Sequence, residues 1–213
     1  MADNAILEEI NENLQQGKAP VVKEKVQQAL DEGIAPETIL NEALIKGMGV
    51  VGERFKRNEV YVPEVLIAAR AMNGAMELIK PRLVEAGVKA KATALVATVK
   101  GDLHDIGKNL VCMMLEGAGY EVVDLGVNVD PQKFVAAVDE HSADLIGLSA
   151  LLTTTMGAMK STIDALVEAG VRDKVKVMVG GAPLTQSFSD EIGADGYAPD
   201  AASAVELADS LIA

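Results

Sequence analysis

The sequence predicts an α/β protein in two parts: an N-terminal four-helix bundle over residues 1–88 and a five-stranded parallel domain over residues 89–213. Two observations predict this division. Apolar residues recur at helical spacing in the first part, whereas β-rich runs alternate with helical runs in the second. A stretch with several lysines, Pro81 and Gly87 separates the two patterns and is typical of a linker. We therefore expect a small bundle joined to a doubly wound sheet.

Four apolar stripes account for the first part. They cover residues 5–14, 20–33, 36–55 and 63–79. Three of them begin at a proline, which suits the first turn of a helix because an N–H there has no partner within the helix. Short connections between the four stripes favour helices that pack side by side as a bundle.

The second part contains five β-rich runs, each followed by a helical run. The β-rich runs are residues 93–99, 121–125, 144–149, 176–179 and 196–198. The helical runs are residues 108–118, 131–141, 156–169, 185–192 and 200–212. Regular alternation of strand and helix indicates a parallel sheet with helical crossovers, and five strands fit a Rossmann-type, flavodoxin-like order.

Composition and charge exclude several classes of partner. The chain has 32 acidic and 19 basic residues and a net charge of −13, whereas a nucleic-acid-binding face needs clustered lysine and arginine. No apolar run reaches the roughly eighteen residues of a membrane span, and the polar start, residues 1–4, does not resemble a signal peptide. The single cysteine, Cys112, fits a reducing compartment. We expect a cytoplasmic protein that binds neither nucleic acid nor membrane.

The polar stretch Lys-Gly-Asp-Leu-His-Asp-Ile-Gly-Lys-Asn, residues 100–109, follows the first predicted strand. The carboxyl ends of parallel strands are the usual ligand site of such sheets. The stretch lacks the glycine spacing of a dinucleotide or phosphate loop. It offers instead His104 with the carboxylate of Asp102 two residues earlier. That pair can be a local hydrogen bond or helix cap, or a metal-binding imidazole whose tautomer the carboxylate sets.

The loops expected after the other strands can extend this site. Residues 126–129 are mostly uncharged, residues 149–155 are rich in hydroxyls, and residues 180–183 begin with two glycines. The last strand carries Tyr197. Taken one at a time, these features are typical of helix caps, turns and core. Taken together, they predict a slot walled by small residues that leads away from the imidazole and can hold a long, flat ligand.

The motif Asp102-x-His104-x-x-Gly107 resembles the cobalamin-binding signature, and the match extends over residues 97–110. The chain as a whole resembles the corrinoid proteins of methyltransferase systems and the cobalamin module of methionine synthase. This resemblance implies cobalamin or a related corrinoid as cofactor. It also implies that the helical part is a cap over the cofactor's upper, methyl-bearing face.

The resemblance assigns roles to individual residues. His104 would replace the corrinoid's own base as the lower axial ligand of cobalt, Asp102 would accept the other imidazole N–H, and Thr155 would complete the relay. Methionine synthase has a serine where this chain has Thr155. Phe55 and Val62 would cover the upper face, although Phe55 also suits an ordinary core position. The other cofactor-binding residues that we predict are Asp105, Ile106, Gly107, Ser149, Leu151, Thr153, Gly180, Gly181 and Tyr197.

The function implied is that of a methyl carrier, not itself a catalyst. Co(I) would take a methyl group from a substrate held by a substrate-specific methyltransferase. The methyl-Co(III) protein would deliver it to a second methyltransferase, with tetrahydrofolate or a thiol as acceptor. A reductive activating protein would restore oxidised cobalt. O-demethylation of aryl methyl ethers is our first expectation for the donor, with methanol, methylamines and betaines left open.

Three other readings remain open from the sequence. The chain can be a cobalamin-dependent sensor, although no DNA-binding segment is visible. It can be the small subunit of an adenosylcobalamin mutase, although the helical cap with Phe55 argues against this. Asp102, His104 and Asp105 can hold a hydrolytic metal, although His141 is expected at the opposite edge of the sheet and leaves that site without a second histidine.

Overall fold

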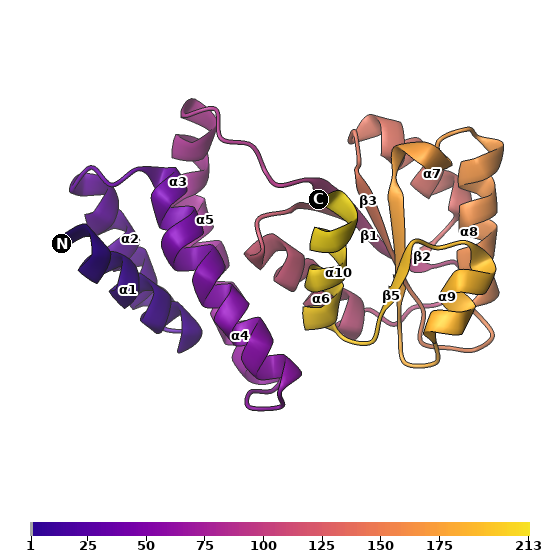
Figure 1. The fold of residues 1–213 in the computed structure, drawn as a ribbon, viewed down its shortest axis with the longest axis horizontal. Coiled ribbons are helices and arrows are strands. Elements are labelled where there is room, and N and C mark those ends of the chain that lie inside the picture. Colours follow the sequence, from indigo (N-terminus) through magenta and orange to yellow (C-terminus); the bar gives the residue numbers. More distant parts are fainter. Residues whose placement is uncertain (1) are drawn as a thin grey trace. The chain divides into compact units, whose positions relative to one another are not determined.

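A computed structural model describes residues 2–213, and Met1, the first residue of the polar start, lies outside the described residues. The chain forms two compact units. One comprises the chain up to Ala90 together with Gly117–Gly119, and the other comprises Lys91–Glu116 and Tyr120–Ala213. The first is helical, and the second surrounds a sheet with helices (Figure 1). Within residues 2–213, no helix combines the length and the apolar character that crossing a membrane requires.

The helical unit contains the four helical stretches that the sequence predicts. Its segments are α1 (Ala2–Gln15), α2 (Ala19–Asp31), α3 (Pro36–Thr38), the π-helix η1 (Ile39–Ile45), α4 (Lys46–Lys56) and α5 (Val62–Glu85). The third stretch is thus continuous from Pro36 to Lys56 but passes through a π-helical segment. Fully buried side chains from the different helices, among them Ile10, Leu14 and Leu44, form the core of this unit. The apolar stripes therefore face one another, as in a bundle.

After Ile79, the sequence predicts the last turn of the fourth helix and a linker within residues 80–91. Helix α5 continues through Pro81 to Glu85. A proline inside a helix removes one N–H and crowds the carbonyl four residues earlier, which disfavours the helix at that point. Beyond the proline, Leu83 is buried and continues the apolar stripe. Packing therefore extends the helix past a residue that would otherwise end it, and the connection to the sheet is limited to residues 86–92.

The second unit has the predicted parallel sheet in the flavodoxin-like order. Its strands are β1 (Thr93–Val99), β2 (Glu121–Val129), β3 (Leu145–Ser149), β4 (Lys176–Gly180) and β5 (Gly196–Ala198). They lie in the order β2-β1-β3-β4-β5, all parallel. The helices are α6 (Ile106–Gly117), α7 (Pro131–Glu140), α8 (Gly157–Glu168), α9 (Gln186–Ile192) and α10 (Ala201–Ile212), with a short 3-10 turn η2 (Arg172–Lys174).

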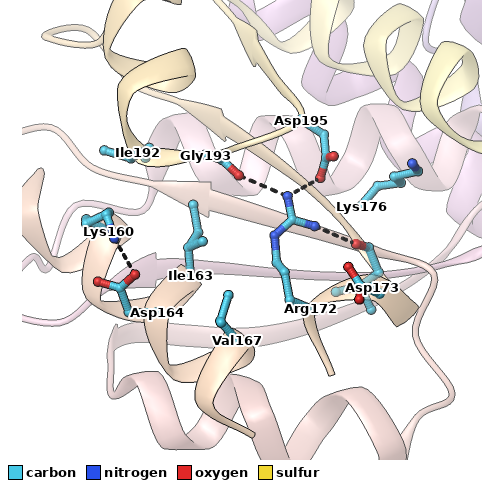
Figure 2. A pocket seen from close by; sticks show the side chains of 11 residues that line it. Lys160, Ile163, Asp164, Val167, Arg172, Asp173, Lys176, Ile192, Gly193 and Asp195 are labelled. Carbon is cyan, nitrogen blue, oxygen red and sulfur yellow. Dashed lines mark hydrogen bonds and ion pairs between the residues drawn. The ribbon is translucent and has the colours of Figure 1, made fainter. Parts of the chain in front are cut away.

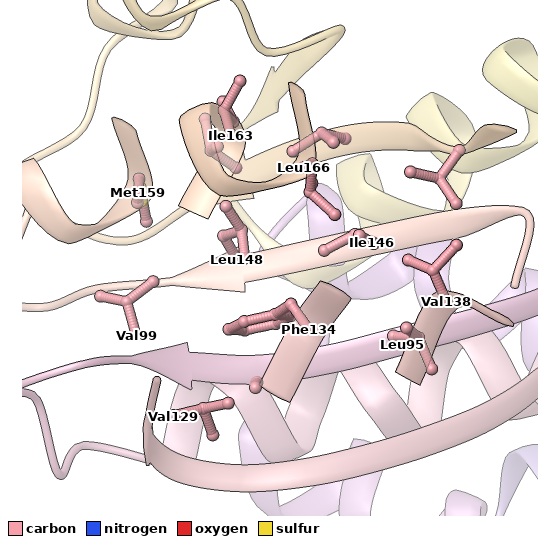
Figure 3. Close-up of a cluster of buried hydrophobic side chains, with 14 of the residues drawn as sticks. Leu95, Val99, Val129, Phe134, Val138, Ile146, Leu148, Met159, Ile163 and Leu166 are labelled. Atoms are coloured by element: carbon pink, nitrogen blue, oxygen red, sulfur yellow. The ribbon is translucent and has the colours of Figure 1, made fainter. Parts of the chain in front are cut away.

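Helices cover both faces of this sheet (Figure 1). On the face covered by α7 and α8, the fully buried Phe134 of α7 packs among Leu95, Ile146 and Leu166 (Figure 3). Residues between these on the strands, such as Val96, point to the other face, since side chains alternate along a strand. Burial on both faces explains why the central strands are continuous apolar runs.

Strand β2 departs from the prediction, which ends it at residue 125 and places a loop at 126–129. The strand continues to Val129 but is irregular. Val96 pairs with Asp124, Ala97 with Gly126 and Val99 with Val129, so β2 uses more residues than β1 over the same length. Gly126 and Asn128 have φ values of 95° and 52°. The sequence hides this because a bulged, mostly exposed edge strand has no regular apolar alternation.

Candidate functional site

His104 lies on the loop between β1 and α6, and Asp102 orients its ring. The Asp102 side chain is fully buried, and its Oδ1 accepts the His104 main-chain N–H (3.0 Å) and lies 2.7 Å from Nδ1. A carboxylate can only accept, so Nδ1 carries the ring proton and Nε2 keeps a lone pair. The imidazole is 51% exposed. The structure therefore presents a nitrogen ligand at the carboxyl end of the sheet.

The second oxygen of Asp102 reaches the loop after β3. Oδ2 accepts hydrogen bonds from Leu151 N–H (2.8 Å), Leu152 N–H (3.3 Å) and the Thr155 hydroxyl (2.8 Å). Burial raises the pKa of Asp102, but the hydrogen bonds from His104, Leu151 and Thr155 outweigh it and hold this pKa below its ordinary value. The fixed negative charge of Asp102 thus lies next to Nδ1 of the imidazole. The structure brings together the three residues predicted to form the relay.

Two residues that we did not predict hold the His104 loop from the side of the sheet. Buried Thr98 donates its hydroxyl to the His104 carbonyl (2.7 Å). Asn128 accepts from Gly101 N–H through Oδ1 (2.8 Å) and donates its own N–H to the Asp102 carbonyl (2.9 Å). Thr98 could have been found from the sequence as a hydroxyl residue near the end of a mostly apolar strand. Asn128 was harder to find, because its only sign is that asparagine tolerates the left-handed conformation of turns.

Exposed apolar side chains surround this loop. They belong to the loops and strand ends that follow β1, β2 and β3, which are neighbours in the sheet. They are Leu103, Ile106, Val127, Leu151 and Leu152. The predicted cofactor contacts Ile106 and Leu151 are among them. An apolar cluster left open to solvent at one edge of a sheet marks a binding surface more often than a structural one.

The glycine loop after β4 touches the loop after β3. Ser149 at the end of β3 is in register with Gly180 at the end of β4. Gly181 has a φ of 140°, and a Cβ there would lie 1.9 Å from the Ala150 carbonyl oxygen. The absence of a side chain at Gly181 is therefore required by the protein's own backbone. A role for Gly180, Gly181 and Ser149 beside a ligand stays a prediction.

The remaining predicted residues are more scattered. Asp105 and Gly107 are exposed where α6 begins, and Thr153 is exposed in the turn after β3. Tyr197 lies within β5, not in the loop after it, and packs against the core cluster because it pairs with Val179. In the helical unit, Phe55 near the end of α4 and Val62 at the start of α5 are both half-buried. Their roles in binding stay predictions.

A hollow of about 510 Å³ lies at the other end of the sheet, against α8 and the starts of β4 and β5 (Figure 2). Its central cation is Arg172, which donates to the carbonyls of Val175 (3.0 Å) and Gly193 (2.9 Å) and to Asp195 (2.8 Å). Both terminal guanidinium nitrogens are thus used in joining two chain segments, residues 172–175 and 193–195. We interpret this hollow as structural.

The hydrolytic-metal reading finds no support in the geometry. Both oxygens of Asp102 already accept hydrogen bonds from the protein. Across residues 5–213, whose side chains the structure describes, no cluster of three or more histidine, cysteine, aspartate or glutamate side chains is arranged to hold an ion. His141 follows α7 at the amino end of β3, away from the His104 loop.

The fold and the site define a cofactor-binding α/β module with an imidazole ligand and an apolar rim. Residues 92–206 match the model of a family described as "B12 binding domain", and residues 6–80 match a second model with the same description. The first match alone covers more than half of the chain. The chain therefore belongs to the B12-binding domain family.

Comparison with individual proteins narrows this class to corrinoid proteins. The chain is 43% identical to the dimethylamine corrinoid protein of Methanosarcina barkeri over 100% of both chains. It is 41% identical to a corrinoid protein of Desulfitobacterium hafniense (strain Y51) over 98% of both. The protein is thus a cobalamin-binding corrinoid protein of the methyl-carrying kind found in methylamine and methanol methyltransferase systems.

Two solved structures share the architecture. A chain of the methanol:cobalamin methyltransferase complex MtaBC from Methanosarcina barkeri superimposes with a TM-score of 0.87 at 34% identity, covering 98% of this chain and 80% of that one. A cobalamin-binding protein from Desulfitobacterium hafniense DCB-2 superimposes with a TM-score of 0.80 at 31% identity, covering 96% and 98%. The helical unit followed by a five-stranded sheet is therefore the family's arrangement.

The residues at the carboxyl end of the sheet fit a corrinoid. His104 offers a bare imidazole nitrogen, as a cobalt ligand must. The exposed apolar rim around it suits the flat, largely apolar underside of a macrocycle.

Proposed function

We propose that this protein carries a methyl group between two methyltransferases on a corrinoid whose cobalt is bound from below by His104. The observation that carries the proposal is the half-exposed imidazole whose Nδ1 is held by buried Asp102, which leaves Nε2 free. When bound, the cobalt supplies the chemistry, since it can take up a methyl group and release it to a different acceptor. The chain supplies the ligand and controls its charge.

Asp102 and Thr155 act on that ligand. The carboxylate fixes the ring tautomer and makes the imidazole a stronger donor, while the Thr155 hydroxyl and two main-chain N–H groups hold the carboxylate in place. A proton taken up by the Asp102–His104 pair would weaken the imidazole as a ligand. The pair therefore adjusts how firmly the metal is held from below.

The other predicted contacts complete the proposal. Ile106, Leu151 and their apolar neighbours would contact the underside of the ring. Ser149, Gly180, Gly181 and Tyr197 would border the tail that His104 displaces. The resemblance assigns Phe55 and Val62 to the upper face. The remaining predicted contacts are Asp105, Gly107 and Thr153.

The proposed partners are a substrate-specific methyltransferase, a second methyltransferase for the acceptor, and a reductive activating protein. The similar chain in the methanol complex supports the first of these. We propose tetrahydrofolate or a thiol as the acceptor. The donor is chosen by the first partner. Several relatives are dimethylamine or trimethylamine corrinoid proteins, which favours methylamines among the donors that the sequence left open beside O-demethylation.

The ligand assignment is tested by reconstituting the full chain, labelled with nitrogen-15 histidine so that imidazole splitting differs from that of the cofactor's own base, with hydroxocobalamin and recording paramagnetic resonance in the Co(II) state. We expect nitrogen splitting from the imidazole in the wild type and its loss in His104→Ala. The chain has two histidines, so His141→Ala is the matched control and should keep the splitting. Splitting that persists in His104→Ala, or that is absent from the wild type, would contradict the proposal.

The donor is tested separately. Reduced, reconstituted protein is mixed with methyltransferases specific for methylamines, methanol or aryl methyl ethers and their substrates, and methylation is followed by absorption. One class of methyltransferase should load the protein much faster than the others. Loading by none of them would contradict the role as a carrier, whatever the ligand.

A further inference from the structure

We propose that Asn128, on the edge strand β2, is a positioning residue for the cobalt-ligand loop, a proposal that rests on the function proposed above. Two reciprocal contacts carry it. Gly101 N–H donates to Asn128 Oδ1 at 2.8 Å, and Asn128 N–H donates to the Asp102 carbonyl at 2.9 Å. Asn128 thus clamps the dipeptide Gly101–Asp102 from both ends, two residues before His104.

The irregular path of β2 places Asn128 for this contact. While β1 advances from Val96 to Val99, β2 advances from Asp124 to Val129, so β2 contains two extra residues. Such bulges re-aim side chains and are over-represented beside active sites. Asn128 itself has a left-handed φ of 52°, a conformation that asparagine adopts more readily than other residues with a side chain.

Further contacts hold the bulged segment. Asp124 Oδ1 accepts from Gly126 N–H at 2.9 Å. Asp124 also forms an ion pair with Lys108 of α6, whose side chain is almost completely buried. An exposed ion pair between Lys100 and Asp130, at 2.6 Å, joins the loop after β1 to the residue that follows β2. The edge strand β2 therefore contacts helix α6 and the loop after β1. Asn128 is the residue of β2 that binds Gly101 and Asp102 in that loop.

The clamp matters because the loop contains a glycine just before the motif. Gly101 has a φ of 86° and no side chain to restrict it. Asp102 orients the imidazole through its side chain, but the position of Asp102 depends on its main chain. That main chain is held by Asp102 N–H to the Val99 carbonyl (3.1 Å) and by the contact from Asn128. A loop fixed before cobalt arrives loses less conformational freedom on binding.

Two substitutions at Asn128 separate its acceptor from its backbone. Asn128→Gly is compatible with the left-handed conformation, keeps the main-chain N–H that donates to Asp102, and removes the side chain that carries the acceptor Oδ1. Asn128→Asp keeps an acceptor on a residue that also tolerates this conformation. Asn58→Gly, at another left-handed asparagine (φ 58°) in the helical unit, is the matched control. Asn128→Ser, with a shorter side chain, replaces the glycine variant if that variant does not fold.

The first readout is amide hydrogen exchange of Gly101 in the full chain without cobalamin. We expect exchange about fivefold faster in Asn128→Gly, the factor that corresponds to one hydrogen bond. The second readout is the dissociation constant for hydroxocobalamin together with nitrogen splitting in the Co(II) state. In Asn128→Gly the constant should rise about fivefold and the splitting should weaken. Asn128→Asp and Asn58→Gly should stay within about twofold of the wild type in both readouts.

Three results would overturn the proposal: unchanged Gly101 exchange in Asn128→Gly, faster exchange with unchanged affinity and splitting, or an aspartate variant as defective as the glycine variant. Failure of the proposed function looks different. In that case the wild type itself lacks imidazole splitting, or His104→Ala keeps it, while Gly101 exchange still reports on the clamp.

Discussion

The two ends of the sheet each place an aspartate in a hydrogen-bond network, and only one network leaves a ligand atom free. At the amino end, Asp195 accepts from Arg172 and from Val177 N–H, and the guanidinium also binds two carbonyls. At the carboxyl end, Asp102 accepts hydrogen bonds from the main-chain N–H and from the Nδ1–H of His104. The other ring nitrogen, Nε2, takes no part in this network. The first network joins chain segments; the second orients a ring.

The two aspartate networks differ in whether they leave an atom available to bind a ligand. A hollow lies beside Arg172, yet its central cation is used internally. The His104 loop is more open, but it combines a free lone pair, a fixed charge and an exposed apolar rim. Hydrogen bonds that satisfy all their partners stabilise a fold, whereas binding needs an atom that the fold leaves available.

The largest expected effect is that of Gly181→Ala at the carboxyl end. The new Cβ would lie 1.9 Å from the Ala150 carbonyl oxygen at a φ of 140°, so we expect a loss of about 4 kcal/mol in the free energy of unfolding. Gly193→Ala at the amino end also has a positive φ, of 77°, but meets open space and should cost about 1 kcal/mol. Urea denaturation measures both; equal losses would show that the loop contact is not the cause.

Arg172→Ala tests the structural reading of the amino end. The substitution removes the guanidinium from the carbonyls of Val175 and Gly193 and from Asp195, which keeps only Val177 N–H as a donor, and the two charged side chains are only 19% and 23% exposed. We expect a loss of about 3 kcal/mol with unchanged cobalamin affinity. Lys174→Ala, in the same turn but in an exposed ion pair, should cost less than about 0.5 kcal/mol. Weakened cobalamin binding at full stability would instead make the hollow a ligand site.

We expect the contribution of Asp102, at the carboxyl end of the sheet, to make the stability of the protein depend on pH in the acid range. Because hydrogen bonds hold the folded-state pKa of Asp102 below that of the unfolded chain, ionised Asp102 stabilises the fold above about pH 4, and this contribution is lost as the pH falls further. Asp102→Asn lacks it. The free energy of unfolding, measured by urea between about pH 6 and pH 3, should therefore fall less steeply in Asp102→Asn than in the wild type.

The control for this pH series is Asp139→Asn, which removes a carboxylate from an exposed ion pair with Lys174. Its profile should follow that of the wild type. Parallel profiles for Asp102→Asn and the wild type would mean that the buried carboxylate does not contribute to acid sensitivity.

The smallest expected effect on stability is that of His104→Ala. The ring is 51% exposed, and Asp102 Oδ1 keeps the main-chain N–H of residue 104 as a partner. We expect a loss of less than about 1 kcal/mol by thermal unfolding of the protein without cobalamin. A loss comparable to that of Arg172→Ala would place His104 among the structural residues and remove the contrast between the two ends.

The sequence by itself determined which stretches form strands and helices, apart from the ends of β2 and α5, together with the sheet type and the Asp102–His104 pair. The central strands are readable because burial on both faces makes them short apolar runs. The pair is readable because its two members lie two residues apart on one loop, so no long-range packing is needed to bring them together. The place of Thr155 in the relay came from resemblance, since nothing local connects it to Asp102.

Only the tertiary structure decided which distant residues support that pair. Thr155 reaches Asp102 because β1 and β3 are neighbours, and Asn128 reaches Gly101 because β2 gains two residues at the sheet's edge. Packing of Leu83 likewise carries α5 beyond Pro81. Local sequence preferences set where elements form, whereas strand order, bulges and burial set which of their side chains meet, and these depend on the whole chain at once.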